Sequence, residues 1–484
     1  MSSNYTPTIG LEIHAELQTA SKMFCSCKND PFEDTPNLHV CPVCMGHPGT
    51  LPVLNKEAIR FVLKMGIAIN GTRADFTEWD RKNYFYPDIP KGYQISQYKY
   101  PLISGGELSG VALERIHLEE DTAQSTHDAH EKSLVNFNRA GVPLMELVTK
   151  PVIHDAATSV RFAKELQLLL RYIGAGAANM EKGEMRVEAN ISVATPENTA
   201  AGKFGTKTEV KNLNSFRAVE KAIDFEIARQ SALLDEGGTV VQETRGWDDT
   251  KQETYSQRTK ESSHDYRYFP DPDLPKLKLS QISEFAIETL KKELPELPWV
   301  KRDRFKTAYA MTDKEVAVFI DSTPLSSYYE SIVSTCSGDA KRIKLTTNYL
   351  LTDYLKLVKD VAVEGTNYDY SASIPSATFA DLITMVAAGD INSRAAKDIL
   401  GLLFTDTSAS PKALAEKHGL IQKSDASELI PAIEKVISDN AAVVAEYKGG
   451  KVTSLQFLIG QAMKATKGSG NPEVVKKLLI EKLG

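Results

Sequence analysis

The stretch I-G-L-E-I-H-A-E-L, residues 9–17, alternates between apolar side chains and glycine, glutamate or histidine. Alternation with a period of two predicts a β-strand that has one apolar face and one polar face. The polar face carries Glu12, His14 and Glu16, which together offer a concentrated set of oxygen and nitrogen ligands. A bound cation would explain this set, but an ordinary exposed strand with acidic side chains would give the same pattern.

Two later segments extend this polar pattern. The segment H-L-E-E-D, residues 117–121, follows a predicted hairpin that starts near residue 105, and it crowds three carboxylates beside a histidine. Like charges this close repel one another, so a cation is expected to hold them. Oxygen-rich ligand sets prefer magnesium to zinc. The strand predicted over 184–193 places Glu188 and Asn190 on a third polar face. Three such faces in one domain favour a shared cation site.

Four of the five cysteines lie within residues 25–44, where C-S-C is followed after 13 residues by C-P-V-C. Two close pairs of thiolates are the usual ligands of a closed tetrahedral zinc site, which is structural because no coordination position stays open. The spacing predicts a zinc knuckle, with free thiols or a redox pair as alternatives. Its ligands would be Cys25, Cys27, Cys41 and Cys44. Cys336 stands alone and is expected to have no special role.

Length and charge set further bounds. A chain of 484 residues is too long for one hydrophobic core, so two or three domains are expected. The net charge of -7 argues against a surface built for indiscriminate nucleic-acid binding, so any RNA contact has to come from local basic patches. No apolar run is long enough to span a membrane, and the N-terminus has no signal-peptide pattern. We therefore expect a cytoplasmic protein without membrane contact.

Several basic residues lie where a phosphate could bind. Residues 80–98 interleave aromatic side chains with cations such as Lys82, which suits a pocket that stacks a base or sugar and binds phosphate. A proline-rich loop that covers a core edge is the alternative. Arg139 lies in a predicted turn, where it either contacts phosphate or pairs with residues 117–121. Lys207 lies on a predicted strand shortly before a helix N-terminus near residue 216, a position that also suits phosphate. The chain has no G-x-x-x-x-G-K-[ST] loop, which excludes a P-loop kinase.

The second half of the chain has helical periodicity. It begins near residue 295, where E-L-P-E-L-P-W-V-K-R combines prolines and charges as a linker does. Between Lys448 and Lys482, seven lysines against two glutamates leave a local charge of +5. This is either a footprint for RNA phosphates or only a solvated helix surface. We predict an α+β fold: a mixed or antiparallel-sheet domain over 1–294 that contains the zinc knuckle 25–44, a helical domain over 295–405, and a small helical tail domain over 406–484.

Taken together, these motifs resemble the B-subunit family of the bacterial tRNA-dependent amidotransferases. The resemblance continues to the C-terminal Q-F-L-I-G-Q-A-M-K-A-T-K-G-S-G-N-P, and the four cysteines match the zinc-bearing branch of the family. The earlier matching segments occur in one order over residues 9–275: G-L-E-I-H-A-E-L, D-R-K-N-Y-F-Y-P-D, Y-Q-I-S-Q, H-L-E-E-D, N-R-A-G-V-P-L-M-E, V-K-N-L-N-S-F and S-S-H-D-Y-R-Y-F-P-D-P-D-L-P.

The resemblance implies an ATP-dependent carbon–nitrogen ligase that acts within a heterotrimer. In this family the N-terminal cradle domain transfers the terminal phosphoryl group of ATP to the side-chain carboxylate of Glu-tRNA(Gln) or Asp-tRNA(Asn). Ammonia then displaces phosphate and gives Gln-tRNA(Gln) or Asn-tRNA(Asn). By similarity, Glu12, His14 and Glu120 are predicted as Mg²⁺ ligands and catalytic residues. Strand alternation instead favours Glu119, which joins Lys82 as a further catalytic candidate. Candidates around ATP or the acyl end, chosen mainly by polar-face position, are Arg139, Glu188, Asn190 and Lys207.

The resemblance also implies partners. The chain shows no amidase signature and no compelling cysteine glutaminase, so another protein has to supply ammonia. In this family an amidase A subunit does so through an internal channel, a small C subunit wraps around both, and the lysine-rich tail of the B subunit contacts the misacylated tRNA. Two other classes of function stay open: a noncatalytic tRNA-binding or scaffolding protein, and a free-standing metal-dependent hydrolase that works without ATP.

Overall fold

The opening stretch forms the strand β1 (Thr6–Glu16), which lies inside the largest sheet of the protein. A computed structural model describes residues 4–127, 132–259, 265–361, 368–422, 426–466 and 470–484. In it β1 pairs antiparallel with β11 (Pro143–Thr149) on one side and with β12 (Met185–Ala194) on the other. The polar face predicted for the stretch therefore lies between two neighbouring strands.

The sheet is mixed and has ten strands. Beyond β12 follow β13 (Thr208–Leu213), β14 (Glu243–Asp248) and β15 (Glu253–Thr259), and only the β13–β14 pair is parallel. Beyond β11 follow β8 (Val111–Glu120), β6 (Ile103–Ser104) and β2 (Thr72–Arg73), with β7 (Glu107–Leu108) forming the predicted hairpin with β8. A mixed sheet followed by helices confirms the predicted α+β class.

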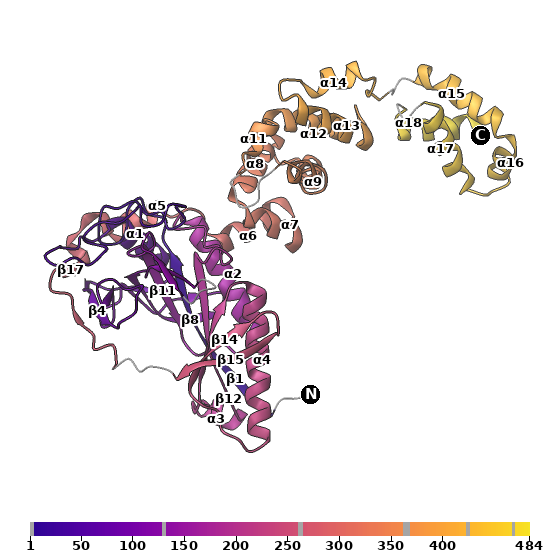
Figure 1. Ribbon diagram of the computed structural model, residues 1–484. Coiled ribbons are helices and arrows are strands. Elements are labelled where there is room, and N and C mark those ends of the chain that lie inside the picture. Colours follow the sequence, from indigo (N-terminus) through magenta and orange to yellow (C-terminus); the bar gives the residue numbers. More distant parts are fainter. Residues whose placement is uncertain (1–3, 128–131, 260–264, 362–367, 423–425, 467–469) are drawn as a thin grey trace. The chain divides into compact units, whose positions relative to one another are not determined.

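Helices cover the apolar side chains of the sheet. Leu11 and Ile13 of β1 are at most 1% exposed. Helix α4 (Phe216–Asp235) packs against α2 (Ala156–Tyr172), β12 and β13, as Figure 1 shows. The sequence predicts Ser215 and Asp155 as the N-caps of these two helices, and in the structure each side chain accepts a hydrogen bond from a backbone N–H of the first turn. Helix α1 (Lys56–Ala68), capped by Asn55, packs against β8 and β6.

A small three-stranded sheet lies beside the large one. Its order is β16 (Phe269–Pro270), β4 (Asp80–Asn83) and β5 (Tyr93–Ser96), and β5 packs against β8. The aromatic and basic residues of 80–98 therefore meet the segment D-Y-R-Y-F-P, although the S-S-H that precedes it in the matching motif lies outside the described residues. The sheet brings two distant motifs of the sequence together.

The chain divides into two compact units, residues 1–298 and 299–484. The domain boundaries predicted at 294 and 405 stay predictions. Unit 2 is helical throughout its described part, and its first helices are α6 (Pro298–Tyr309), α7 (Asp313–Asp321), α8 (Thr323–Val333) and α9 (Ala340–Tyr349). The periodicity of residues 345–357 predicts one helix, but the structure divides this stretch: α9 ends at Tyr349, a π-helical turn covers Leu350–Tyr354, and α10 spans Leu355–Lys359.

The C-terminal helices have a core of their own. Leu429, Leu458 and Leu479 belong to one buried cluster formed by α15 (Ala426–Asp439), α17 (Ser454–Ala465) and α18 (Pro472–Leu483), beside α16 (Ala441–Lys448). The helix predicted as the start of the tail, α14 (Pro411–Lys417), packs instead on α12 (Ser376–Ala388) and α13 (Ser393–Thr405). Its buried Leu414 therefore does not join the tail core. No helix among the described residues is long and apolar enough to cross a membrane.

Candidate metal centres

The strand register places polar side chains from four strands in one row. His14 of β1 lies opposite Arg186 of β12 and Glu146 of β11, and Glu146 lies opposite His117 of β8. Because directly opposed residues of antiparallel strands share a face, the row runs across one surface of the sheet. Glu12 and Glu119 lie next to this row on the same surface.

These side chains converge on His14. Its Nε2 lies 3.4 Å from Glu146 Oε2, 3.6 Å from Glu119 Oε1 and 3.9 Å from Glu12 Oε1. His117 Nε2 reaches the same Glu146 oxygen at 3.4 Å. We call Glu12, His14, His117, Glu119 and Glu146 the carboxylate–histidine cluster. Ligand atoms of Glu12, His14 and Glu146 all lie within 4.8 Å of one another, as do those of His117, Glu119 and Glu146, so either set is close enough to hold one cation.

Glu12 also belongs to a second acidic group. Its carboxylate, Glu188 and Glu209 offer oxygens that lie within 4.8 Å of one another. Lys211 forms an ion pair with Glu188 at 2.8 Å and approaches Glu209 at 4.0 Å. The predicted polar faces of β1, β12 and β13 therefore meet, and Glu12 lies between two possible cation positions.

Burial and neighbouring charges raise the pKa of two residues of the cluster, so protons compete with a cation for this site. Burial and the charge of Glu146 raise the pKa of Glu12 to about 7. Burial alone would lower the pKa of His14, but its hydrogen bond and charge interaction with Glu146, helped by Glu119 and Glu12, raise it to about 9. His14 is thus protonated at neutral pH in the metal-free protein, and a metal has to displace that proton.

The predicted ligand Glu120 does not lie in this cluster. Successive side chains of a strand point to opposite faces, so Glu119 shares the face of His117 and Glu120 points away. Glu120 instead pairs with Lys91 at 2.6 Å and accepts a hydrogen bond from the backbone N–H of Ile95 at 2.9 Å. The set of Glu12, His14 and Glu120 is therefore not brought together, whereas Glu119 lies within the cluster.

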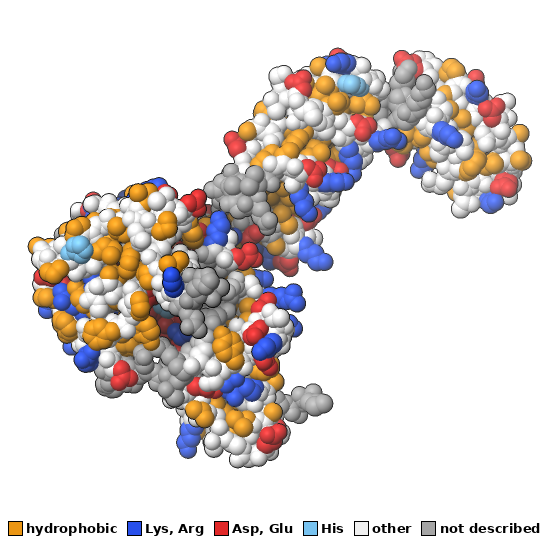
Figure 2. Space-filling view, viewed as in Figure 1, with side chains coloured by type: hydrophobic (Ala, Val, Ile, Leu, Met, Phe, Trp, Pro, Cys, Tyr) orange, Lys and Arg blue, Asp and Glu red, His pale blue; other side chains and the backbone are white. Residues whose placement is uncertain are grey.

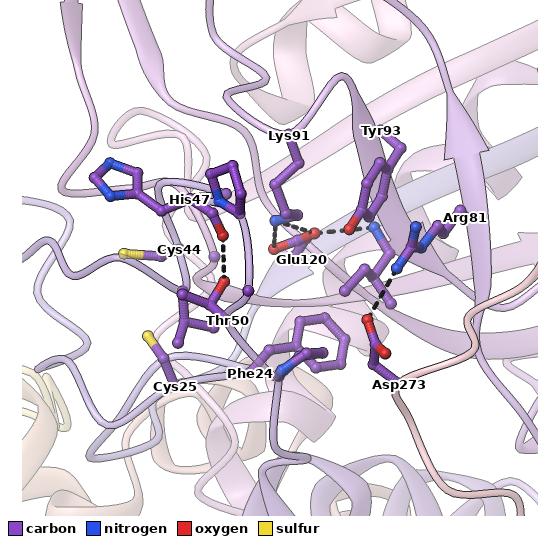
Figure 3. A pocket seen from close by; sticks show the side chains of 17 residues that line it. Phe24, Cys25, Cys44, His47, Thr50, Arg81, Lys91, Tyr93, Glu120 and Asp273 are labelled. Carbon is purple, nitrogen blue, oxygen red and sulfur yellow. Dashed lines mark hydrogen bonds and ion pairs between the residues drawn. The ribbon is translucent and has the colours of Figure 1, made fainter.

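Glu120 and Lys91 line a separate cavity of about 210 Å³, shown in Figure 3. Its walls include Cys25 and Cys44 on one side and Arg81, Tyr93 and Asp273 on the other, with Phe24 between the two groups. The Arg81 guanidinium lies 4.4 Å from the Tyr93 ring centroid and donates to Asp271 at 2.7 Å. The cavity thus connects the cysteine-containing loop to the small sheet.

Lys82 points toward the carboxylate–histidine cluster. Burial alone would lower the pKa of Lys82, but the charge of Glu119 raises it well above the usual range, so the ammonium stays charged. Its Nζ lies 5.0 Å from the Tyr266 ring centroid and 5.8 Å from that of Tyr84. Residues 80–98 therefore place a cation among aromatic rings beside the acidic cluster, and their predicted role in binding phosphate stays a prediction.

The other predicted residues lie in different places. Arg139 donates to the backbone carbonyls of Thr122 and Ala123, both at 3.0 Å, and approaches Asp121 at 3.6 Å. Of the two roles considered for Arg139, the structure therefore shows the contact with the acidic segment. Asn190 is half-buried on β12, opposite Gly10 and Glu209. Lys207 is exposed and immediately precedes β13.

Glu16 does not join the cluster either, although it shares the strand face. Burial and the nearby Asp121 charge raise the pKa of Glu16 to about 8. Asp121 is held by Arg186, whose Nη2 forms a short hydrogen bond to it. The Nε of Arg186 is buried and has no hydrogen-bond partner in the described part of the chain.

Sequence reasoning missed Glu146, Glu209 and Arg186 as site residues, whereas His117 was noted as the histidine of the acidic segment 117–121 and not chosen as a ligand. Glu146 had a readable signal, because it is the single carboxylate in the apolar run P-L-M-E-L-V. Arg186 and Glu209 were visible only as members of polar strand faces. Which of these faces lie next to one another depends on strand order and register, and a local pattern does not contain that information.

The four predicted zinc ligands do converge. The sulfur atoms of Cys25, Cys27, Cys41 and Cys44 all lie within 4.8 Å of one another. Cys44 Sγ also accepts a hydrogen bond from the backbone N–H of Cys41 at 3.2 Å. Four converging sulfurs in two close pairs fit a tetrahedral metal, and this soft ligand set favours zinc over magnesium. We call them the cysteine cluster. The lone Cys336 is buried at the end of α8, far along the chain from this group.

The fold and site together define a sheet-based enzyme domain with candidate metal positions, followed by helices. Comparisons with known proteins narrow this class. The family described as "GatB/GatE catalytic domain" matches residues 7–283, and the one described as "GatB domain" matches residues 327–483. The chain belongs to the GatB family, the B subunits of aspartyl/glutamyl-tRNA(Asn/Gln) amidotransferases, which confirms the family expected from the motifs.

Relatives share this similarity over their whole length. The B subunit of the aspartyl/glutamyl-tRNA(Asn/Gln) amidotransferase of Myxococcus xanthus is 42% identical over 491 residues, which cover 100% of this chain and 99% of the relative. The B subunits of the same name from Caldicellulosiruptor saccharolyticus and Persephonella marina are each 41% identical and cover 99% of both chains. The similarity thus spans both units.

Proposed function

We propose that this chain is the phosphorylating subunit of a tRNA-dependent amidotransferase. It would activate the side-chain carboxylate of Glu-tRNA(Gln), Asp-tRNA(Asn) or both, for amidation by ammonia. The observation that carries this proposal is the convergence of two acidic groups on Glu12, beside the charged Lys82, within a domain of the GatB family.

The chemistry explains why such a site is needed. A carboxylate is a poor acyl donor because its leaving group would be oxide. Attack of a carboxylate oxygen on the terminal phosphorus of ATP breaks the bond to ADP and forms an acyl phosphate. Ammonia then attacks the acyl carbon, inorganic phosphate leaves, and the nitrogen loses a proton to give the amide. The site therefore has to gather negative charge from two substrates.

Magnesium, when bound, would neutralise part of the charge on the phosphoryl group that is being transferred. From this chain, Glu12, His14 and Glu146 would hold one ion, and Glu12, Glu188 and Glu209 a second. Glu119 lies close enough to His14 to complete or position the first set. This ligand assignment replaces Glu120 with Glu146, because Glu120 points to the opposite face.

Two side chains would contact phosphate directly. Lys82 keeps its charge beside Glu119 and is surrounded by the rings of Tyr84 and Tyr266, which limit its motion. Arg186 is oriented by Asp121, and its side chain is 35% exposed, so the guanidinium is accessible to a phosphate. Positioned cations of this kind act electrostatically on phosphoryl transfer. We infer that both bind ATP phosphates, while Arg139 fixes the segment that follows β8.

Other parts of the chain would serve binding and assembly. The cysteine cluster would hold a structural Zn²⁺, because its four sulfurs leave no coordination position for substrate. An amidase A subunit would supply ammonia from glutamine, and a small C subunit would complete the heterotrimer. These partners are inferred from family membership.

The tail would contact the tRNA. Lys464, Lys476 and Lys477 are exposed, whereas Lys451 and Lys482 pair with Glu446 at 2.9 Å and Glu434 at 2.7 Å. Lys467, counted in the tail charge, lies outside the described residues. Figure 2 shows basic, acidic and apolar side chains interspersed over the helical unit. This distribution suits a few phosphate contacts better than one continuous basic groove.

The deciding experiment uses the chain assembled with its A and C subunits, ATP, Mg²⁺ and each misacylated tRNA in turn. Ammonium chloride replaces glutamine, so that glutaminase activity is bypassed. Wild type should form ADP and the amidated aminoacyl-tRNA together, and Glu12→Ala should form neither while it still binds tRNA. Glu107→Ala, which removes an exposed carboxylate of β7, is the matched control.

The outcomes also separate the rival functions. Full activity of Glu12→Ala would remove the catalytic assignment. Complete lack of tRNA-dependent ADP formation by the wild-type assembly would favour a scaffolding role. Product formation without ATP would favour a metal-dependent hydrolase.

A further inference from the structure

Lys22 is a lysine whose side chain is 0% exposed. It lies between β1 and the first cysteine pair, and its backbone N–H donates to the carbonyl of Cys27 at 3.0 Å. Transfer of an ammonium from water into a protein interior costs several kcal/mol unless an anion and hydrogen-bond acceptors compensate it. The phosphoryl-transfer site described above makes no use of this residue, so its buried charge requires another explanation.

The surroundings of the ammonium identify its acceptors. Lys22 Nζ donates to the backbone carbonyl of Phe137 at 3.1 Å and lies 3.9 Å from Cys44 Sγ. Within the described ranges, no hydrogen bond or ion pair joins this Nζ to a carboxylate. The nearby Glu120 is already paired with Lys91 at 2.6 Å. Among the described residues, Cys44 is therefore the one contacting side chain that can carry a negative charge for Lys22.

The residues around Cys44 are packed closely against Lys22. A Cβ placed on Gly141 would lie 3.5 Å from Cys44 Cβ and 3.6 Å from Lys22 Cδ, and the φ of Gly141 is +85°. Glycine thus allows residues 137–141 to lie directly against the cysteine cluster. Asn138 in the same segment accepts from the backbone N–H of His39 at 2.9 Å and donates to the carbonyl of Thr35 at 2.8 Å.

We propose that Lys22 is the counter-charge of a four-thiolate metal site and ties that site to residues 137–141. Four thiolates around a divalent metal carry a net charge of -2, which a buried ammonium reduces. The inference rests on the metal-binding role proposed for the cysteine cluster. Lys22 is a positioning residue, since it would act on the metal through Cys44.

The test compares Lys22→Met with Lys28→Met in the full chain. Methionine keeps the length of the side chain and removes its charge, and Lys28 is a 62% exposed lysine of the same loop that pairs with Asp30 at 2.7 Å. Zinc affinity is measured by competition with a chromophoric chelator under reducing conditions. Loss of a residue that supports metal ligands typically weakens binding about 10–100-fold. We expect such a loss for Lys22→Met and a change below about twofold for Lys28→Met.

A second measurement separates counter-charge from simple packing. The unfolding temperature of each variant is recorded with zinc bound and after chelation. If Lys22 compensates thiolate charge, Lys22→Met should destabilise the zinc-bound protein more than the zinc-free protein, because the site carries more thiolate charge when the metal is bound. Equal destabilisation of both forms, or unchanged zinc affinity, would overturn the proposal.

Further outcomes keep the test decisive. If Lys22→Met does not fold, zinc affinity is measured for Lys22→Gln, which retains a donor for Phe137 without the charge. Weaker zinc binding by Lys22→Gln supports the proposal, and unchanged binding overturns it. If the wild-type chain takes up no zinc, the metal-binding role proposed for the cysteine cluster is wrong. If wild type and Lys22→Met bind zinc equally well, that role stands and the counter-charge proposal is wrong.

Discussion

The two candidate metal sites of unit 1 are assembled in opposite ways. The cysteine cluster comes from one loop of 20 residues, Cys25 to Cys44, and its four ligands are all of one type. The carboxylate–histidine cluster takes its ligands from three strands, β1, β8 and β11, and the adjoining acidic group adds β12 and β13. The first site could be closed around a metal by its four sulfurs, while the second has Glu12 shared between two possible positions.

The one-loop sulfur site and the multi-strand oxygen-rich site suit different roles. A closed sulfur site holds a loop in place and therefore contributes to folding. An oxygen-rich site on a sheet can be fixed by the strands and still have coordination positions for a substrate. The charges follow this division, since Lys22 is fully buried beside the cysteines, whereas Lys82 and Arg186 are only half-buried.

The largest expected effect comes from Glu146→Gln. Glu146 contacts both His14 and His117 at 3.4 Å, so loss of its charge changes the surroundings of both histidines. We expect tRNA-dependent ADP formation by the assembled enzyme to fall at least about 100-fold, the scale for removal of one electrostatic contributor. The control variant Glu107→Gln should leave tRNA-dependent ADP formation unchanged. A Glu146→Gln enzyme within about threefold of wild type would show that the row is not the reaction site.

The next effect concerns stability. Cys41→Ser removes one of four sulfurs, so zinc content and folded yield should both fall. A loss of about 2–3 kcal/mol would lower the unfolding temperature by about 5–10 °C. The control is Cys336→Ala, which should leave zinc content unchanged because Cys336 lies outside the cluster. Unchanged zinc and stability in Cys41→Ser would remove the zinc hypothesis.

A smaller effect distinguishes two neighbouring carboxylates. Glu119→Gln should weaken binding of Mn²⁺, a paramagnetic substitute for Mg²⁺, by about tenfold, in keeping with loss of a ligand or its support. Glu120→Gln should change Mn²⁺ binding less than about twofold, because Glu120 pairs with Lys91 on the other face. Electron paramagnetic resonance reports the free ion. If Glu120→Gln weakened Mn²⁺ binding more than Glu119→Gln, the metal ligands would be Glu12, His14 and Glu120 after all.

The smallest effect is a pH dependence. The folded-state pKa of His14 is raised to about 9, so its proton is bound below that pH and has to leave when a metal binds. Mn²⁺ affinity should therefore rise from pH 8 to 9, by less than about tenfold for one proton. His14→Gln should bind more weakly and flatten this slope. An unchanged slope would exclude His14 as the displaced group.

Much of the fold was readable because its signals are local. The caps Asn55, Asp155 and Ser215 and the alternation of β1 and β12 each depend on neighbours along the chain. The same holds for the cysteine spacing. The break between α9 and α10 was missed because a π-helical turn keeps a nearly helical hydrophobic pattern. The packing of α14 on α12 and α13 could not be predicted, because packing partners are not encoded in the period of a helix.

The family, the sheet-then-helix order and the polar face that carries Glu12 and His14 all follow from local patterns in the chain. Which other side chains reach that face depends on how the strands assemble. Strand order placed β11 and β12 on either side of β1, and register set Glu146 and Arg186 opposite His14. The pleat then selected Glu119 over Glu120. The physical reason is that a strand specifies alternation locally, whereas neighbouring strands and their register are fixed by the packing of the whole sheet.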